Sequence, residues 1–556
     1  MEHTMTLLRL LTIIVVLEGW KPSKATFAPD GDEDRSVCYV IDSVDEKTKT
    51  AKQVPCAEIE SHTFSPVYKF DDYNQFSLSA LYNQMQTHSS NVAVFEEDSM
   101  ASCPETQHDY ALYNQMQTHS SNVAVFEEDS MASCDETQHD YGHYEVQYAF
   151  TFLPIHCGRR IRTVHRVSIL TNSSSSCASV KLSFPLSNNI SDINITLSPG
   201  SGQSILIPEA YPEIDPRNRD PYGEITNTTI VISAIGKVHA YAFTECQQGN
   251  QASAFRLLDV DDIGTNYWVM SYHSYPKHKM LAVVSIYDNT SIQIHWNTSI
   301  APELYPNNIT ILLNKFQTYT LALEFDPTGV QLTSNKPISV FSGHTKASIP
   351  ATPSTDPIAE CLKPVEDWGR VFSLTQLVDP KFAGGYIVRI LSSSTNNITT
   401  WKLGGNHNET TLAAGEFLEV LVDGNVTHPL EIVASNKVLV VQFTVMNDHT
   451  SPVMLQVPSQ EHHRISNEIL FPVFDMTDTN TTTYLTVWLP PEVDILQLSL
   501  NERAVWKFID KDSSEWSIFQ TILEVGFNRL AIQGNGNVHA IVYSYGHRRA
   551  YAYTIA

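Results

Sequence analysis

The sequence predicts an all-β protein made of tandem β-sandwich-like modules of about 100 residues, preceded by an irregular acidic N-terminal region. Three observations predict this class. Extended segments of about five to eight residues recur roughly every ten residues. Helical periodicity is almost absent, and one strand motif returns at nearly constant intervals along the chain.

The recurring motif is a polar turn followed by an apolar strand, and it occurs four times. Its copies are AIGKVHAYAFT at 234–244, TSNKPISVFSG at 333–343, ASNKVLVVQFT at 434–444 and NGNVHAIVYSYG at 535–546. Aligning Lys237, Lys336, Lys437 and Asn537 gives steps of 99, 101 and 100 residues. Such a strand is typical of the last strand of a sandwich sheet. A four-bladed propeller is the competing architecture, but its blades are typically about 40 to 50 residues long, so we favour four sandwiches in a row.

The interior of the second repeat shows the alternation expected of a half-buried strand. LAVVSIY is followed by a turn and then by SIQIHW, where Ile292, Ile294 and Trp296 alternate with polar residues, so one face is expected to be buried.

The predicted organisation is a signal peptide at 1–25, an N-terminal β-hairpin region with an acidic duplicated loop at 26–142, and β-sandwich modules at 143–247, 248–347, 348–447 and 448–556.

The N-terminus reads as a secretory signal. Arg9 precedes an apolar run from Leu10 to Leu17, and small residues follow up to Ala25, after which we expect cleavage. The run is about half of the roughly 20 residues that a membrane-spanning helix needs, and a short buried helix is the alternative. No later stretch is long and apolar enough to span a bilayer, and HRRAYAYTIA at the C-terminus carries no lipid-anchor signal. We therefore expect a secreted, extracellular chain with no membrane span.

A nearly literal duplication supplies much of the negative charge. Residues 80–110 recur at 111–141 with one change, Pro104 in the first copy and Asp135 in the second. The two copies hold eleven acidic residues and neither Lys nor Arg, which favours a solvated surface loop. The alternative is a metal site that uses the four histidines of this segment, His88, His108, His119 and His139. The formal net charge of the whole chain is −26, which makes nucleic acid a poor candidate as a partner.

Eight cysteines in an exported chain are expected to form disulfides, and none of them has zinc-like spacing. They are Cys38, Cys56, Cys103, Cys134, Cys157, Cys177, Cys246 and Cys361. Eight cysteines allow 105 pairings, so the connectivity stays open. Cys38 with Cys56 could close a hairpin, and Cys157 with Cys177 could brace the next pair of strands.

Eleven N-x-S/T sequons predict N-glycosylation, and most of them fall where strands are expected to turn. They are Asn172, Asn189, Asn194, Asn227, Asn289, Asn297, Asn308, Asn397, Asn408, Asn425 and Asn480.

The sequence offers no familiar catalytic motif, and we expect neither an enzyme nor a cofactor. It contains no GxSxG, HExxH, P-loop or dinucleotide fingerprint. Ser342 and His344 lie two residues apart on one expected strand, which favours a strand end entering a turn over a catalytic pair.

Three other clusters have a structural and a functional interpretation. DVDDIG at 259–264 is faintly like a calcium loop but fails the EF-hand spacing, so an acidic linker turn is favoured. Residues 461–463 (EHH) are interpreted as a polar linker between modules rather than a metal site. Trp401, Trp488 and Trp516 could form a ligand surface, but a strand tryptophan is more often part of a core.

Five segments resemble, in order, the N-terminal domain of the IgGFc-binding protein family. They are GTNYWVMSY at 264–272, AVVSIYDNTSIQIHW at 282–296, TGVQLTSNKPISVFSGH at 328–344, ECLKPVEDWGRVF at 360–372 and GGYIVRILSSSTNNIT at 384–399. The resemblance is strongest from about Gly264 to Val445. It implies a secreted, mucus- or surface-associated binding protein, and the family's name implies attachment to antibody Fc.

The chain departs from the family in its cysteines. Where the family has a cysteine soon after the F-S-G-H strand, this chain has Thr345 and Lys346, so Cys361 needs another partner, for which Cys246 is the candidate. The cysteine-dense von Willebrand-type domains of long family members are absent, and Fc binding has no motif that carries over to particular residues.

The leading functional hypothesis is an extracellular binding or adhesion protein whose modules present loops to a glycoprotein, mucin or microbial surface. The alternatives are a secreted hydrolase acting on polysaccharide with carboxylates from different modules, and a purely structural matrix protein. A hydrolase would need convergent titratable groups, whereas a binding module needs only a complementary surface.

Overall fold

The computed structural model describes the backbone of residues 37–43 and 49–55 and the residues from 144 to 555, apart from short gaps. The gaps are 158–160, 218–219, 248–250, 275–277, 297–305, 350–354, 378–383, 446–450, 463–467, 477–480, 502–504, 534–537 and 547–548. The chain divides into two units, Met1–Met131 and Ala132–Ala556, which are described separately.

The described part of the first unit is one hairpin. Strand β1 (Val37–Ser43) pairs antiparallel with β2 (Lys49–Pro55), and Cys38 lies opposite Val54. The expected signal peptide, the duplicated acidic loop with its four histidines, Cys103, Cys134 and the side chains of Cys38 and Cys56 lie outside the described residues.

In the second unit the described elements are strands and two short 3-10 turns, which confirms the all-β prediction. We call its first set of strands module 1. These strands are β3 (Glu145–Phe150), β4 (Thr163–Leu170), β5 (Ala178–Ser183), β6 (Ile193–Leu197), β7 (Gly202–Leu206), β8 (Glu224–Thr226), β9 (Ile230–Ile235), β10 (His239–Cys246) and β11 (Ala252–Arg256). All of them except β8 form two sheets, β3-β9-β5-β6 and β11-β10-β4-β7, whereas β8 pairs with a strand of module 2 (318–323). The core between these sheets takes the alternate residues Val167 and Ile169 from one layer and Val180 and Leu182 from the other.

Module 2 follows the same plan with one long central strand. Its elements are β12 (Gly264–Trp268), β13 (Lys279–Ser285), β14 (Thr290–His295), β15 (Asn308–Leu313), β16 (Thr318–Leu323), β17 (Gln331–Ala347), β18 (Asp356–Leu362) and the 3-10 turn η5 (Val365–Asp367). The first half of β17 pairs with β12 and β14, and its second half pairs with β13 and β18. In module 1 the corresponding strand is broken at Gly236, whose φ of 92° suits glycine, into β9 and β10.

Modules 3 and 4 repeat this order of pairing. Module 3 contains β19 (Gly369–Leu374), β20 (Gly385–Ser392), β21 (Asn397–Leu403), β22 (Asn406–Leu412), β23 (Phe417–Asp423), β24 (Leu430–Thr444) and β25 (Met454–Gln456). Module 4 contains β26 (Glu468–Val473), β27 (Thr482–Leu489), η6 (Ile495–Gln497), β28 (Leu498–Leu500), β29 (Val505–Lys511), β30 (Ser517–Leu523), β31 (Gly526–Ile532), β32 (His539–Gly546) and β33 (Arg549–Thr554). Strand β24 is the counterpart of β17, and β31 with β32 is the counterpart of β9 with β10.

The internal repeat extends to the register of the strands. The first strand of each of the first three modules has an irregularity near its start, and within the next two paired residues an aromatic ring lies opposite a branched aliphatic residue: Tyr148 opposite Ile232, Tyr267 opposite Leu332, and Phe372 opposite Ile432. The predicted boundaries after 247, 347 and 447 fall just before β11, β18 and β25, each of which pairs with the strand that precedes the boundary. Each motif strand is therefore followed by one more antiparallel strand of its own sheet.

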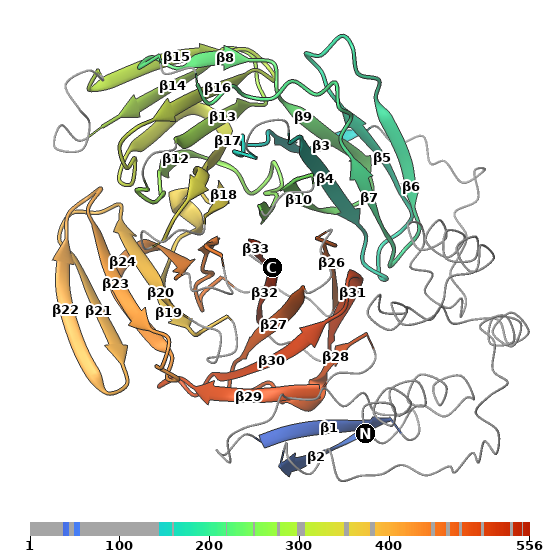
Figure 1. Ribbon diagram of the computed structural model, residues 1–556, viewed down its shortest axis with the longest axis vertical. Helices are drawn as coiled ribbons and strands as arrows, with labels where there is room; N and C mark the ends of the chain where they lie inside the picture. The colour runs from blue at the N-terminus through green and yellow to red at the C-terminus, as the bar shows by residue number, and fades with distance from the viewer. Residues whose placement is uncertain are drawn as a thin grey trace, which may run out of the picture. The chain divides into compact units, whose positions relative to one another are not determined.

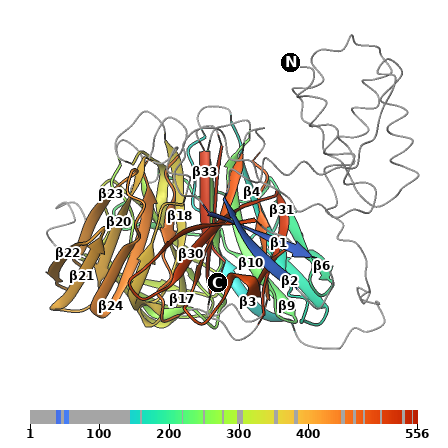
Figure 2. The ribbon, with the colours of Figure 1, turned by 90° about the horizontal axis from the view of Figure 1, so that it is seen from below.

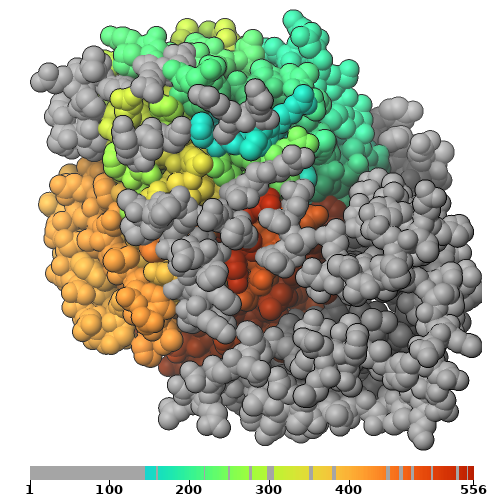
Figure 3. All heavy atoms as spheres, viewed as in Figure 1, coloured from blue at the N-terminus to red at the C-terminus, as the bar shows by residue number. Residues whose placement is uncertain are grey.

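These additional strands bring the four modules into a ring rather than an extended row. Strand β11 contacts β18 and β33, and β25 contacts β18 and β33, so the inner strands follow one another in a closed cycle (Figure 1). Asp356 of β18 accepts hydrogen bonds from the backbone N–H of Ala252 in β11 at 2.9 Å and of Ala550 in β33 at 2.7 Å. The rings of Phe243 and Phe474 stack at 4.6 Å where module 4 meets module 1. Figure 2 shows the strands of module 3 side by side in the turned view, and in Figure 3 the orange atoms of module 3 adjoin the yellow and green atoms of module 2.

The hydrophobic clusters cross the junctions between modules. The cluster of module 1 includes Met280 and Ala282 of module 2, and the cluster of module 2 includes Leu439 and Val441 of module 3. Module 3 also contributes Leu377 and Leu455 to the cluster of module 4. Neighbouring modules therefore stabilise one another, because three of these clusters draw residues from two modules. Among the described residues, no helix has the length and apolar character needed to cross a membrane.

Candidate binding surface

Two pockets lie at the same place in modules 1 and 3. In both modules the linker after the inner strand turns back over the module's own first strand. Val260 donates its N–H to the carbonyl of Gln147 in β3, and Gln460 donates its N–H to the carbonyl of Val371 in β19, both at 2.8 Å. The linker, the first strand and the turn of the repeated motif enclose a pocket in each case, which we call corner pocket 1 and corner pocket 2.

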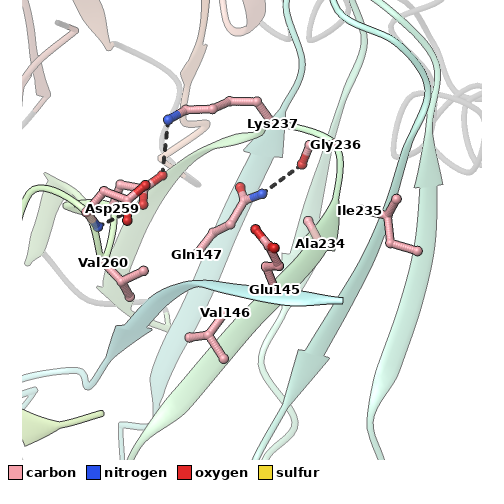
Figure 4. Close-up of a pocket in the computed structure, with 10 residues that line it drawn as sticks. Glu145, Val146, Gln147, Ala234, Ile235, Gly236, Lys237, Asp259 and Val260 are labelled. Atoms are coloured by element: carbon pink, nitrogen blue, oxygen red, sulfur yellow. Dashed lines mark hydrogen bonds and ion pairs between the residues drawn. The ribbon is translucent and has the colours of Figure 1, made fainter. Parts of the chain in front are cut away.

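Corner pocket 1 has a volume of about 350 Å³ and is shown in Figure 4. It is lined by residues 145–147 of β3, 234–237 at the turn after β9, and 259–261 of the linker. The Gln147 amide spans the turn, because its Nε2 donates to the carbonyl of Gly236 at 2.8 Å and its Oε1 accepts the N–H of Val238 at 3.2 Å. The Tyr148 hydroxyl donates to the carbonyl of Val238 at 2.7 Å, which holds the turn from the core side.

The charge of corner pocket 1 is predominantly negative. Glu145, Asp259 and Asp261 line it together with one cation, Lys237, whose Nζ lies 3.5 Å from Asp259 Oδ2. Burial raises the pKa of Asp259, although the N–H of Asp261 and the ammonium of Lys237 favour its charged form. Three carboxyl groups around one ammonium suit a cationic side chain of a partner.

Corner pocket 2 has a volume of about 330 Å³ and the opposite balance of charge. Arg370 of β19, Lys437 of β24 and His462 line it with a single carboxylate, Glu461. Arg370 donates from Nε at 3.0 Å and from Nη2 at 2.8 Å to Glu461 Oε1, and its backbone N–H donates to Oε2. The Arg370 side chain remains 55% exposed. Its remaining N–H groups can therefore reach an anionic ligand such as a carboxylate or sulfate.

In module 2 the corresponding corner is filled. The η5 turn packs over β12, and a Cβ added to Gly264 would lie 2.6 Å from the Pro364 side chain. Lys336 donates from Nζ to the carbonyl of Asp288 and lines neither corner pocket. Lys336 is therefore a matched position at which to test Lys237 and Lys437.

The sequence-predicted pair Ser342 and His344 lies inside β17 and is buried. The His344 Nε2 lies 2.8 Å from the carbonyl of Ser274, and its Nδ1 accepts the N–H of Lys346. Burial lowers the pKa of His344 to about 4. Both ring nitrogens of His344 are thus engaged with backbone groups, and the strand continues to Ala347 instead of ending in a turn after His344.

The two acidic and histidine-rich clusters are parts of the corner pockets. Asp259 faces Lys237, and the Asp262 N–H donates to the carbonyl of Asp259 in a tight turn. Glu461 pairs with Arg370, and His462 Nε2 lies 3.1 Å from the carbonyl of Trp368, while residue 463 is outside the described part. Within the described residues, no group of three or more His, Cys, Asp or Glu side chains is arranged to hold a metal ion.

The three candidate tryptophans belong to cores. Trp488 is 2% exposed in the cluster of module 4, and the half-buried Trp401 and Trp516 pack against the clusters of modules 3 and 4. None of these three rings is an exposed platform for a ligand.

Comparison with known families assigns the chain to a family. The model of the IgGFc binding protein family matches residues 253–546, which span modules 2 and 3 and most of module 4. The chain belongs to the IgGFc binding protein family. The resemblance seen in the sequence from about Gly264 to Val445 is thereby confirmed.

Other comparisons with this IgGFc binding family member add little. No curated protein matches the chain. A structure concerned with host cell surface retention of a 1.5-MDa bacterial ice-binding adhesin matches with a TM-score of 0.10 and 11% identity, covering 53% of this chain and 90% of that one. A Ca²⁺-stabilized adhesin of an Antarctic bacterium matches with a TM-score of 0.09 and 10% identity, covering 69% and 93%. At such TM-scores the likeness supports no conclusion about this chain.

The cysteine pairing that the family resemblance suggested is wrong. Cys246 is bonded to Cys157, not to Cys361, and Cys361 is a buried free thiol. The reason is geometric, because Cys246 ends β10 opposite Thr163, close to Cys157, whereas Cys361 points into the cluster shared by modules 1 and 2. The suggested pairing of Cys157 with Cys177 is also wrong, because Cys157 is bonded to Cys246. Cys177 is disulfide-bonded to another cysteine.

The predicted glycosylation sites of this family member differ in their surroundings. Those that are exposed are Asn189, Asn194, Asn227, Asn289, Asn308, Asn408 and Asn425. Asn172 is half-buried, with its Oδ1 accepting the N–H of Leu470, and Asn297 and Asn480 are outside the described residues. Asn397 is a correction, because it is 0% exposed and its Nδ2 donates to Ser392 Oγ and to the carbonyl of Asn436. A glycan cannot be attached to that nitrogen in the folded chain.

The assembly of the corner pockets could not be predicted from the sequence motifs. Lys237 and Lys437 were aligned by the repeat, but Gln147 and Arg370, which contribute the opposing walls, were not singled out. The available signal was positional, since Arg370 follows the W-G start of module 3 and acidic residues follow the inner strands β11, β18 and β25. Recognising it would have required knowing that each linker returns to the first strand of its own module.

Proposed function

We propose that this protein is a secreted extracellular binding and adhesion protein that presents the rims of a closed ring of β modules to a glycoprotein, mucin or microbial-surface partner. The observation that carries the proposal is the pair of corner pockets of opposite charge at repeated positions of one ring. The match to the IgGFc binding protein family supports a protein ligand as the first class to test.

The ring supports binding by holding these pockets at a fixed spacing. Loops that bind ligands are most effective when a rigid scaffold positions them, because less conformational entropy is lost on association. Hydrogen bonds from two other modules to Asp356 and the shared hydrophobic clusters provide such a scaffold.

The charges suggest how a partner is recognised. Corner pocket 2 suits acidic groups, such as a carboxylate or sulfate on a glycan, and corner pocket 1 suits a lysine or arginine. The net charge of −26 opposes general attraction to acidic glycans, so their recognition depends on the local cations. A glycoprotein offers both kinds of group on one molecule.

A binding screen with charge-reversal variants tests the proposal. The secreted chain is applied to arrays of glycans and glycoproteins that include immunoglobulin Fc, beside the variants Lys237→Glu and Arg370→Glu. Lys336→Glu is the matched control, because it reverses the same charge outside the pockets. We expect at least one ligand whose binding falls in a pocket variant and is retained in the control, with the thermal unfolding of each variant measured in parallel.

The same preparation distinguishes the alternatives. Turnover of a glycosidase substrate that a single carboxylate substitution abolishes would favour the polysaccharide hydrolase instead. Binding that all three variants retain equally would contradict the assignment of the corner pockets.

A further inference from the structure

Three sequons lie on equivalent strands of three modules. Strands β6, β15 and β22 each follow the second strand of the outer sheet as a hairpin, and each pairs with one described strand, namely β5, β14 and β21. Asn194 lies in β6, Asn308 in β15 and Asn408 in β22, and all three side chains are exposed. The three strands are found at the outer margin of the ring (Figure 1).

An outer edge of this kind is a liability in a β protein. It presents a row of backbone N–H and C=O groups that can pair with the same edge of another molecule. Strand β15 reads NITILL and β6 reads INITL, so both are rich in β-branched and apolar residues and carry no charge. On the exposed face of β15, Leu312 is 60% exposed beside Asn308 and Thr310.

Module 4 handles the same position differently. Its outer sheet β26-β31-β28 ends one strand earlier, because β28 pairs with the central strand β31 as β5, β14 and β21 pair with theirs. This edge strand is only three residues long. It carries no sequon. A very short strand is itself a known way to make an edge a poor template for pairing. The sequon is thus present on the three longer edges and absent from the short one.

We propose that N-glycans on Asn194, Asn308 and Asn408 cap the outer edge strands of modules 1, 2 and 3 and prevent edge-to-edge β-pairing between copies of this chain. A glycan is bulky and hydrated, so it blocks the approach of a second strand along the edge that bears it. The inference rests on the secretion included in the proposed function, because attachment requires the secretory pathway.

The three edge strands differ in how much they depend on a glycan to prevent pairing. Strand β22 reads NHNETTL and already carries the charge of Glu409, which disfavours pairing. Strand β15 has no such residue, so its edge depends most on the glycan. The expected order of importance is therefore Asn308, then Asn194, then Asn408.

The test uses the full chain secreted from a glycosylating host, with site occupancy read from the masses of its glycopeptides. Asn308→Gln removes the acceptor, whereas the matched control Thr310→Ser keeps a valid sequon on the same strand. We expect a several-fold larger fraction of dimers and higher oligomers for Asn308→Gln, measured by size-exclusion chromatography with light scattering, and no change for Thr310→Ser. Asn308→Lys loses the glycan but adds an edge charge, and is expected to restore the monomer.

A second arm keeps the test valid if a variant fails to fold. The folded, secreted wild-type chain is trimmed by an endoglycosidase that leaves a single sugar, and oligomerisation is followed over time; we expect it to increase. Unoccupied sites in the wild type, or a monomer that persists after trimming and in the triple variant Asn194→Gln, Asn308→Gln, Asn408→Gln, would overturn the inference. Loss of ligand binding by an intact, monomeric glycoprotein would count against the proposed function alone.

Discussion

The carboxylate of Asp356 accepts a hydrogen bond from the backbone N–H of Ala550 at 2.7 Å, across a separation of 194 residues. Its other oxygen accepts the N–H of Ala252 at 2.9 Å, so one buried side chain of module 2 joins the inner strands of modules 1 and 4. This contact lies at the centre of the ring and explains why module 4 returns to module 1.

Removing the Asp356 carboxylate is expected to destabilise the whole second unit. Asp356→Ala leaves two buried N–H groups without their acceptors, and each such loss costs about 1 to 3 kcal/mol. We expect a fall of about 3 kcal/mol in the free energy of unfolding, measured by urea denaturation. Asp356→Asn keeps one acceptor oxygen and should lose less. The exposed Asp215→Ala is the control, and an equally small effect of all three substitutions would contradict the role of Asp356.

Glu360 gives the ring a predictable pH dependence. Burial raises the pKa of Glu360 from its ordinary value of 4.5 to about 8, although Gln456 donates hydrogen bonds to it. Between these values the folded chain holds a proton that the unfolded chain has released. The contribution of Glu360 to stability is therefore complete below the lower value and is lost as pH rises through the upper one.

The measurement compares wild type with Glu360→Gln by urea denaturation at several pH values across this window. The stability of wild type relative to the variant should fall with rising pH, by up to about 1.4 kcal/mol per pH unit. A difference that stays constant, or that rises with pH, would show that Glu360 is not held protonated in the fold.

Arg389 is expected to be the strongest single contact between modules 2 and 3. It is 5% exposed, and it donates to Asp326 Oδ2 at 2.7 Å, to Glu419 Oε2 at 2.8 Å and to the carbonyl of Ser271 at 2.7 Å. Arg389→Met should lower the free energy of unfolding by about 3 kcal/mol, because the Asp326 carboxylate, whose side chain is only 21% exposed, loses its cationic partner and keeps only the hydrogen bonds from Thr328.

Two companion variants show whether the ion pair is responsible. Asp326→Asn combined with Arg389→Met should cost less than the sum of the two single losses, as expected for groups in contact. Arg217→Ala, which breaks the exposed pair with Asp215, should leave the urea midpoint unchanged. Strict additivity of the Asp326 and Arg389 effects would rule out this ion pair as the cause.

The disulfide between Cys157 and Cys246 spans 89 residues and should contribute to stability chiefly by restricting the unfolded chain. Replacing both cysteines by serine should cost about 2 to 4 kcal/mol in urea denaturation. A non-reducing peptide map should recover the two cysteines in one linked peptide. Burial raises the pKa of Cys361 to about 12, so this thiol should be alkylated only after unfolding. A linked peptide containing Cys246 and Cys361 would contradict the structure.

Local patterns in the sequence were sufficient to predict the strands and their repetition along the chain. The alternation of apolar and polar residues in TSIQIH matches the alternation of buried and more exposed residues in β14. The four copies of the repeated motif lie on the central strands β10, β17, β24 and β32. The burial of Asn397 could not be predicted from the sequence, because a sequon does not indicate whether its side-chain nitrogen is buried. Ring closure was also out of reach, because it depends on contacts such as that of Asp356 with Ala550, which no local pattern encodes.

The corner pockets could be predicted from the sequence only in part. The repeat placed Lys237 and Lys437 at equivalent turns, but the acidic linker residues Asp259 and Glu461 were interpreted as separate loops. Their opposing positions follow from the return of each linker to the first strand of its module, which is a tertiary property.

A double-mutant cycle between Phe243 of module 1 and Phe474 of module 4 tests the closed ring most directly. Their rings stack at 4.6 Å across the junction, whereas the pair Phe508 and Phe519 lies within module 4 and serves as a positive control. With each phenylalanine changed to leucine singly and together, we expect a coupling of about 1 kcal/mol in the free energy of unfolding for both pairs. A coupling of zero between Phe243 and Phe474, with the control pair still coupled, would contradict the closure of module 4 onto module 1.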